Sequence, residues 1–279
     1  MNSLPGHLIS QQVSQALAED LGAGDLTAGL LDPETRIRAS IVCRETAVLC
    51  GVDWVAEVYR QLDSGITLDW DARDGDRIEA GQTLCRLEGR VRSLLSGERT
   101  ALNYLQTLSG TATLARRYAD EVSGTPARIL DTRKTIPGLR LQQKYAVTCG
   151  GCDNHRIGLF DAVLIKENHI RAAGSITAAL ARAFEQVPQG TSVEIEVESL
   201  DELREALQAG ASRILLDNLD PSQLRQAVAI NAGQSRLEAS GGINLETVRE
   251  IAETGVDDIS VGALTKDVRA IDLSMLFDY

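Results

Sequence analysis

A strand-then-helix rhythm that begins near residue 127 constrains the fold of this chain more than any other feature of its sequence. Short apolar runs of strand length recur at intervals of about 20–35 residues, and each is followed by a polar residue or a glycine. This alternation is typical of a parallel sheet, either a β/α barrel or a doubly wound sheet. The runs are 127–130, 162–165, 193–197, 213–216, 237–239 and 258–261.

Helix signals lie between several of these runs. Residues 199–202, Ser-Leu-Asp-Glu, form a capping box, and the helix that follows is expected to end at Gly210. Asn244 opens a similar helix that is expected to end at Gly255. The pair 220–221, Asp-Pro, marks a third helix start, with proline at the first helical position.

The first 110 residues do not follow this rhythm. They mix helical patterns with strand candidates and turns, which predicts an α+β domain over residues 1–110 and a barrel domain over residues 111–279. The expected helices are 8–21, 52–62 and 94–108, and the expected strands are 37–43, 47–50, 66–70 and 83–87.

Composition excludes several classes of protein. The 279 residues carry a formal charge of −12, which argues against a general nucleic-acid binder. No run approaches the roughly 20 apolar residues of a membrane span, and the N-terminus lacks the pattern of a signal peptide. Five cysteines, an odd number in a chain this long, indicate reduced thiols and a cytoplasmic protein.

One segment reverses the overall charge. Residues 128–166 hold seven lysines or arginines against three aspartates, a local charge of +4, so the remainder carries −16. The segment also contains three of the four lysines in the chain. A basic island in an acidic protein indicates a small, highly anionic ligand, although a solvated face with ordinary ion pairs is an open alternative.

The residues that end the expected strands predict where chemistry occurs, because a β/α barrel builds its active site at the carboxyl ends of its strands. Cations, carboxylates and glycine turns would converge there on one rim. The strand ends are 131–134, 166–169, the alternating Glu194, Glu196 and Glu198, 217–218, 240–242 and 262–263.

Each of these features also has a purely structural interpretation. The three glutamates could form the solvent-exposed face of an edge strand, although alternating Glu favours a polar barrel interior. Asp217 could cap a helix, and the glycines could be simple turns, although such turns commonly hold phosphate in barrels. Cys149 and Cys152 with His155 have the spacing of half a zinc site, but no second pair follows. His169 is expected to be a packed or hydrogen-bonding histidine.

Seven motifs, in order and covering essentially the whole chain, resemble the nicotinate-nucleotide pyrophosphorylase family, also called quinolinate phosphoribosyltransferase. They are Thr132–Arg140 (TRKTIPGLR), Lys144–Val147 (KYAV), Asn154–Arg156 (NHR), Leu164–His169 (LIKENH), Leu216–Asn218 (LDN), Ala239–Ile243 (ASGGI) and Ile259–Ala263 (ISVGA). The resemblance leaves Cys149 and Cys152 outside the catalytic set.

The resemblance implies a fold, a reaction and an assembly. The fold would be an N-terminal α/β sandwich followed by an incomplete parallel β/α barrel of about seven strands, six of which are visible as apolar runs. The reaction would join quinolinate to phosphoribosyl pyrophosphate with Mg2+, giving nicotinate mononucleotide, pyrophosphate and CO2, a step of NAD synthesis. The assembly would be a homodimer, with a hexamer as a larger alternative, acting without nucleic acid or membrane.

The resemblance also implies residue roles. Arg133, His155, Arg156 and Lys166 would bind the two quinolinate carboxylates, joined by Arg99 from the partner subunit. Thr132, Lys134, Ser240, Gly241, Gly242, Gly262 and Ala263 would bind phosphoribosyl pyrophosphate. Glu196 and Asp217 would hold ribose hydroxyls and Mg2+, and the catalytic set would be Lys134, Lys166, Glu196 and Asp217.

Three rival functions can be weighed on the sequence. A relative of the same fold could act on another aromatic acid or serve metal uptake, although the motifs at 154–156 and 166–169 favour the quinolinate enzyme. Residues 74–84 resemble half of a biotinyl or lipoyl carrier module, but no lysine precedes Lys134 to accept a cofactor. A non-catalytic scaffold would leave the convergent rim unexplained.

Overall fold

The structure is a computed structural model that describes residues 4–278. Two compact units make up the chain. The first combines residues 1–116, 141–151 and 267–279, and the second combines residues 117–140 and 152–266. In these compact units a central segment and the C-terminal segment both belong with the N-terminal residues.

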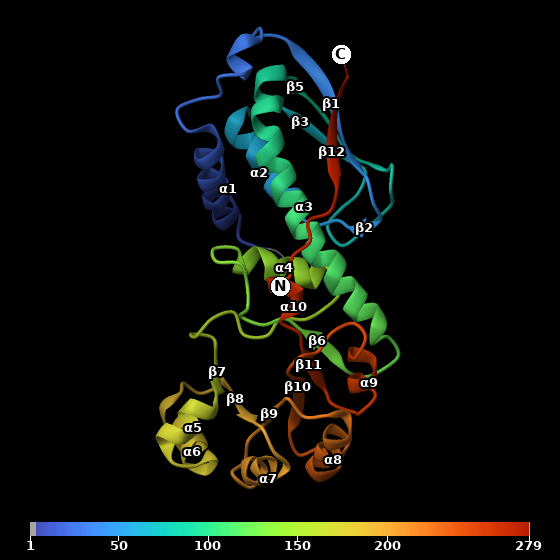
Figure 1. The fold of residues 1–279 in the computed structure, drawn as a ribbon. Coiled ribbons are helices and arrows are strands. Elements are labelled where there is room, and N and C mark those ends of the chain that lie inside the picture. Colours follow the sequence, from blue (N-terminus) through green and yellow to red (C-terminus); the bar gives the residue numbers. More distant parts are fainter. Residues whose placement is uncertain (1–3, 279) are drawn as a thin grey trace. The chain divides into compact units, whose positions relative to one another are not determined.

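Within the described residues, the first unit contains a four-stranded antiparallel sheet in the order β12-β1-β5-β3 (Figure 1). Its C-terminal strand pairs with β1, with Ile41 opposite Met275, and this pairing explains why the last residues join this unit. A short pair, β2 with β4, lies apart from the main sheet. The strands are β1 (Arg36–Cys43), β2 (Ala47–Val48), β3 (Thr67–Trp70), β4 (Arg77–Ile78), β5 (Thr83–Arg90) and β12 (Leu273–Asp278).

Helices pack against this sheet through buried apolar faces. In the first helix, Ile9, Val13 and Leu17 repeat every four residues and are all buried, which is the pattern of an amphipathic helix. Trp54 and Tyr59 of the second helix are among the largest fully buried side chains of the unit. The helices are α1 (Gly6–Leu21), the 3₁₀ turn η1 (Ala28–Leu30), α2 (Val52–Leu62), α3 (Val91–Glu121) and α4 (Arg140–Cys149).

The second unit contains, among the described residues, a six-stranded parallel sheet in the order β6-β11-β10-β9-β8-β7. All six apolar runs predicted from the sequence form these strands. A further extended residue, Asp153, makes a single parallel bridge to Leu130 beside β6. The strands are β6 (Arg128–Leu130), β7 (Ala162–Ile165), β8 (Ser192–Val197), β9 (Arg213–Asp217), β10 (Arg236–Ser240) and β11 (Asp258–Ser260).

Helices follow most of these strands and lie along the outer side of the sheet in Figure 1. The predicted caps are present, since Ser199 accepts a hydrogen bond from the backbone of Glu202 and Asp220 forms a capping box with Gln223. The helix expected to start at Asn244 starts later. The helices are α5 (Glu167–Ala173), α6 (Ile176–Gln186), α7 (Leu200–Gln208), α8 (Pro221–Asn231), α9 (Val248–Ala252) and α10 (Ala263–Lys266).

The inner face of the parallel sheet is polar. Asp258 is fully buried and contacts three arginines, Arg128, Arg213 and Arg236. Burial raises the pKa of Asp258, but the three guanidiniums outweigh this effect and hold its pKa below the ordinary value. This part of the interior thus holds a buried ionic cluster rather than apolar side chains.

Among the helices formed by residues 4–278, none combines the length and the apolar character that crossing a membrane would require.

Candidate active site

A cavity of about 420 Å³ opens at the carboxyl ends of the parallel strands. Nine of the residues predicted from the sequence line it together, in the second unit. The position agrees with the rule that barrel sites form at strand ends. The predicted lining residues are Thr132, Arg133, Lys134, His155, Arg156, Lys166, Glu196, Asp217 and Ser240.

Two guanidinium groups lie next to each other in this cavity. Burial, and then the charge of Arg133, lower the pKa of Arg156 from its ordinary value. One Arg156 nitrogen donates to the carbonyl of Ala162 at 3.3 Å, while the buried Nε of Arg133 has no hydrogen-bond partner among the described residues. The guanidiniums of Arg133 and Arg156 repel each other, and one buried N–H group has no acceptor among the described residues. An anion with more than one carboxylate would relieve both costs.

His155 is held in place from both sides of its ring. The buried Asp131 accepts hydrogen bonds from the side chain of Asn154 at 2.7 Å and from the backbone of His155 at 2.9 Å. Nδ1 of the ring accepts from the backbone N–H of Arg156, so Nε2 carries the ring proton and donates it to Glu194 at 2.9 Å. In this arrangement both ring nitrogens are engaged by the protein.

The carboxylates at the cavity wall have different partners. Lys166, which precedes α5, forms an ion pair with Glu196 of β8. Asp217 ends β9 and accepts a hydrogen bond at 2.8 Å from Asn218. Both carboxylates line the cavity, so two cation-binding oxygen groups face the same space as the guanidiniums.

At two of the turns, close contacts leave little or no room for a side chain and so favour glycine. A Cβ on Gly241 would lie 2.2 Å from the side-chain oxygen of Asn218, and its φ of +105° is in the left-handed region. A Cβ on Gly262 would lie 3.0 Å from Cδ of Lys134, so this lysine passes directly over the turn. Gly241, Gly242, Gly262 and Ala263 are not among the residues that line the cavity.

Two glutamates of the second unit are almost fully buried. Glu194 and Glu238 are 3% and 1% exposed, and both approach the same nitrogen of Arg213, at 3.6 and 3.5 Å. Glu238 also lies 3.6 Å from Nε2 of His155 and lines the cavity. Burial, and then the charge of Glu194, raise the pKa of Glu238 to about 7.

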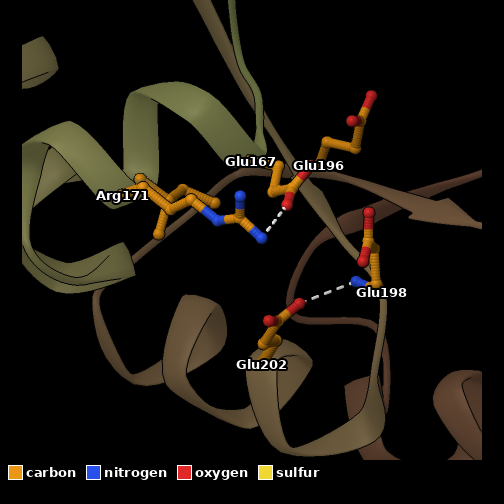
Figure 2. Close-up of a pocket in the computed structure, with 6 residues that line it drawn as sticks. Glu167, Arg171, Glu196, Glu198 and Glu202 are labelled. Carbon is orange, nitrogen blue, oxygen red and sulfur yellow. Dashed lines mark hydrogen bonds and ion pairs between the residues drawn. The ribbon is translucent and has the colours of Figure 1, made fainter.

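A second, smaller pocket of about 160 Å³ lies beside the cavity and shares Glu196 with it. Figure 2 shows its acidic wall, in which Arg171 forms an ion pair with Glu167 and the backbone of Glu198 donates to Glu202 at 2.7 Å. Partial desolvation and then the neighbouring carboxylates raise the pKa of Glu198. The pocket gives this side of the rim a negative charge, opposite to that of the arginine pair.

Arg99 lies on α3, in the first unit, and its side chain is exposed. Within the described part of the chain it forms no ion pair, either with Glu98 or with another acid.

The cysteines do not build the half zinc site considered from the sequence. All five lie within the described residues as free thiols, and Cys149 and Cys152 belong to different units. Cys149 instead lies near Cys50 and Asp74. The carboxylate of Asp74 is already satisfied by two backbone N–H groups and by the hydroxyl of Tyr145.

Sequence reasoning missed four residues of the cavity wall. Their signal is the period of two along each strand, because Glu238 has the same parity on β10 as Ser240, and Leu215 the same parity on β9 as Asp217. The four residues are Leu164, Leu215, Glu238 and Ser260.

Comparison with known proteins agrees with this geometry. Residues 25–109 match the model of the quinolinate phosphoribosyl transferase N-terminal domain, and residues 111–276 match that of the C-terminal domain. The solved structure of the nicotinate-nucleotide pyrophosphorylase from Francisella tularensis superimposes with a TM-score of 0.97 and 46% identity, covering 99% of this chain and 98% of that chain.

Curated sequences give the same result. A protein of Bacillus subtilis described as a probable nicotinate-nucleotide pyrophosphorylase [carboxylating] is 40% identical over 257 residues, which are 92% of this chain and 89% of that protein. A Synechocystis protein of the same description is 39% identical, over 97% of this chain and 93% of its own length. With both domain models matched and the basic cavity in place, the chain belongs to the quinolinate phosphoribosyltransferase family.

Proposed function

We propose that this protein transfers the phosphoribosyl group of phosphoribosyl pyrophosphate to quinolinate and releases CO2, giving nicotinate mononucleotide and pyrophosphate for NAD synthesis. The observation that carries the proposal is the pairing of Arg133 and Arg156 in one cavity with Lys166, opposite the carboxylates of Glu196 and Asp217. The cavity thus offers a cationic subsite, formed by the arginines and Lys166, for an aromatic dicarboxylate. Beside it lies an anionic subsite, formed by Glu196 and Asp217, for a ribose.

Quinolinate would occupy the cationic part. Its two adjacent carboxylates match the forks of Arg133 and Arg156, and the buried Nε of Arg133 would gain its missing acceptor. Lys166 would add a point charge. His155, whose ring nitrogens are engaged by Glu194 and by a backbone N–H, would contact the substrate through its ring and would fix the position of Arg156.

Phosphoribosyl pyrophosphate would occupy the other part. Lys134 and the turns at 240–242 and 262–263 would hold its phosphates, since free backbone N–H groups in glycine turns favour anions. Glu196 and Asp217 would bind the ribose hydroxyls and stabilise the positive charge that develops on the sugar as pyrophosphate leaves. Thr132 lines the cavity beside Lys134 and would complete this part of the site.

The donor set fits Mg2+. Glu196 and Asp217 present carboxylate oxygens to the same cavity, and Mg2+ is commonly bound by one or two carboxylates together with substrate phosphates. When bound, the ion would neutralise charge on the pyrophosphate leaving group. The other steps depend on the residues of the chain itself.

The reaction needs positioning more than covalent catalysis. The pyridine nitrogen attacks the sugar carbon and becomes cationic, and this positive charge then stabilises the electron pair left on C2 when the neighbouring carboxylate departs as CO2. No lysine Schiff base is required. Arg133, Arg156 and Lys166 would therefore act by holding the ring in line with the sugar and by compensating its charges.

We further propose that the protein works as a homodimer, with a hexamer as a larger alternative, and that Arg99 completes the site of the partner subunit. An exposed arginine without an ion pair, on a helix outside the barrel unit, is available for such a role. The five free thiols suit a reducing compartment, so the proposed location is the cytoplasm.

A panel of aromatic acids tests the proposal against its nearest rival, an enzyme of the same fold with another substrate. We expect rapid, Mg2+-dependent pyrophosphate release with quinolinate and almost none with nicotinate, which lacks the carboxylate whose departure completes the reaction. Nicotinate or another monocarboxylate supporting release as fast as quinolinate would contradict the substrate assignment.

A further inference from the structure

The proposed reaction has a requirement that none of the roles above satisfies. When the bond between C2 of the ring and its carboxylate breaks, the electron pair stays on C2, and the product carries a hydrogen there. One proton must therefore reach C2 within the cavity. General acids placed at such points typically contribute about 10²–10⁴-fold to a rate.

Most groups that line the cavity are poor candidates for this donor. Arginine side chains hold their protons too tightly to release them near neutral pH. Lys166 is ion-paired with Glu196, and the Nε2 proton of His155 is directed at Glu194. Lys134 passes over the Gly262 turn, where the phosphates would bind.

Glu238 differs from all of these groups. It is 1% exposed, it lines the cavity from β10, and neither of its oxygens has a hydrogen-bond partner among the described residues. Glu194 faces it from β8, with one oxygen that likewise lacks a hydrogen-bond partner within residues 4–278. A buried carboxyl group such as Glu238, with no hydrogen bond to either oxygen, is costly to keep charged.

Burial and the negative charge of Glu194 favour a proton on Glu238, and together they outweigh the neighbours that oppose it. Four elements face Glu238: β8 through Glu194, β9 through Arg213, β11 through Ser260, and the segment of His155. His155 carries a ring proton on Nε2, which it donates to Glu194 and not to Glu238. Arg213 also serves Asp258 at 3.2 Å, so its single charge is shared by three carboxyl groups.

We propose that Glu238, as a neutral carboxylic acid at the floor of the cavity, donates the proton that replaces the departing carboxylate on C2. The O–H bond of Glu238 breaks, the proton joins the electron pair on C2, and Glu238 is left as a carboxylate beside Arg213. It regains a proton from water after the product leaves. This inference rests on the proposed function, since it needs a reaction that expels CO2.

The test separates sugar transfer from protonation. Glu238→Gln keeps the size of the side chain but removes the acid, and Glu238→Asp keeps the acid. In a single turnover with quinolinate, phosphoribosyl pyrophosphate and Mg2+, we expect the glutamine variant to release pyrophosphate within about threefold of the wild-type rate. Nicotinate mononucleotide formation should fall at least about 100-fold, and Glu238→Asp should recover part of it.

An internal competition identifies the donor whichever step limits the rate. In equal volumes of H2O and D2O, the hydrogen-to-deuterium ratio at C2 of nicotinate mononucleotide, read by NMR, reflects the group that delivers the proton. We expect Glu238→Gln to change this ratio and Glu238→Asp to keep it near the wild-type value. Asp258→Asn is the matched control, because Asp258 is a buried carboxylate on the neighbouring strand that does not line the cavity.

Two results would overturn the assignment: an unchanged isotope ratio in active Glu238→Gln, or a loss of pyrophosphate release as large as the loss of product. The second result would mean that Glu238 acts before the proton step or only supports the fold. Wild-type protein that does not consume quinolinate would instead contradict the proposed function, so the two failures can be told apart.

Discussion

Replacing Arg156 with alanine tests the cationic part of the cavity. Arg156 lies against Arg133, and its charge is partly desolvated. A charge-assisted hydrogen bond of this kind contributes about 1.5–3 kcal/mol. Since about 1.4 kcal/mol corresponds to a factor of ten, the loss alone would weaken quinolinate binding by roughly 10- to 150-fold.

A second effect opposes this loss. Removing Arg156 also removes its repulsion of Arg133, so part of the binding energy is recovered, and we expect the KM for quinolinate to rise by roughly 10- to 100-fold. The KM for phosphoribosyl pyrophosphate should stay within about threefold of the wild-type value, because its phosphates are assigned to Lys134 and the glycine turns.

Steady-state kinetics with each substrate varied in turn measures both constants. Arg225→Ala is a matched control, since Arg225 is half exposed and, among the described residues, its ion-pair partner is Glu250 at 3.6 Å, away from the cavity. Thermal melting shows whether either variant is unfolded. Equal increases in KM for the two substrates, or no increase for quinolinate, would refute the role given to Arg156.

Three further predictions follow from the same account. Asp217→Asn should weaken Mg2+-dependent binding of phosphoribosyl pyrophosphate in calorimetric titrations and leave quinolinate binding nearly intact; unchanged Mg2+ dependence would make Asp217 a structural residue. Arg99→Ala and Lys166→Ala should each be inactive, and subunit exchange should restore roughly a quarter of wild-type activity if Arg99 acts across the dimer, because half of the dimers are mixed and each has one intact site. No recovery, with exchange verified by native mass spectrometry, would place Arg99 within its own chain. Finally, because the pKa of Glu238 is raised to about 7, the folded state keeps a proton that the unfolded chain releases above its ordinary value of 4.5. The free energy of unfolding, measured by urea denaturation, should therefore fall as the pH rises from 5 to 7. The fall should be steeper in the wild type than in Glu238→Gln, by up to about 1.4 kcal/mol per pH unit. Parallel pH profiles of the two proteins would contradict the raised pKa.

Local patterns were enough to predict most elements. The strand at 162–165 and the helix at 52–62 match the structure residue for residue, because apolar runs and capping signals act over short distances. The expected helix over 94–108 extends over Val91–Glu121. Gly110 lies inside this helix and does not end it. A Cβ at this position would lie 2.1 Å from the carbonyl oxygen of Arg269, so the glycine allows the two segments to pack closely.

Features that depend on distant contacts could not be predicted. The last strand joins the N-terminal sheet through its pairing with β1, a contact that no local pattern reveals. Glu238 was missed for a different reason: the run 237–239 was recognised as a strand, but only the residues that end strands were considered. The period of two would have placed Glu238 on the same face as Ser240. The turn at Asn244 delays the start of α9, because the Asn244 side chain accepts hydrogen bonds from two backbone N–H groups and stabilises a turn there.

The nine site residues that share the cavity were found because they end strands or belong to the linked motifs. Those motifs fix residue types and spacing, and parallel pairing then brings the strand ends together. The geometry at His155 could not be foreseen, since its backbone is held by Asp131 and its ring by Glu194, which come from two distant segments of the chain.

The most direct measurement of the central claim is a stoichiometric reaction with quinolinate labelled with carbon-13 in the carboxylate next to the ring nitrogen. The account predicts that labelled CO2, pyrophosphate and unlabelled nicotinate mononucleotide form in equal amounts, and only when both phosphoribosyl pyrophosphate and Mg2+ are present. Label retained in the nucleotide product, or pyrophosphate released without labelled CO2 from the wild-type protein, would contradict it.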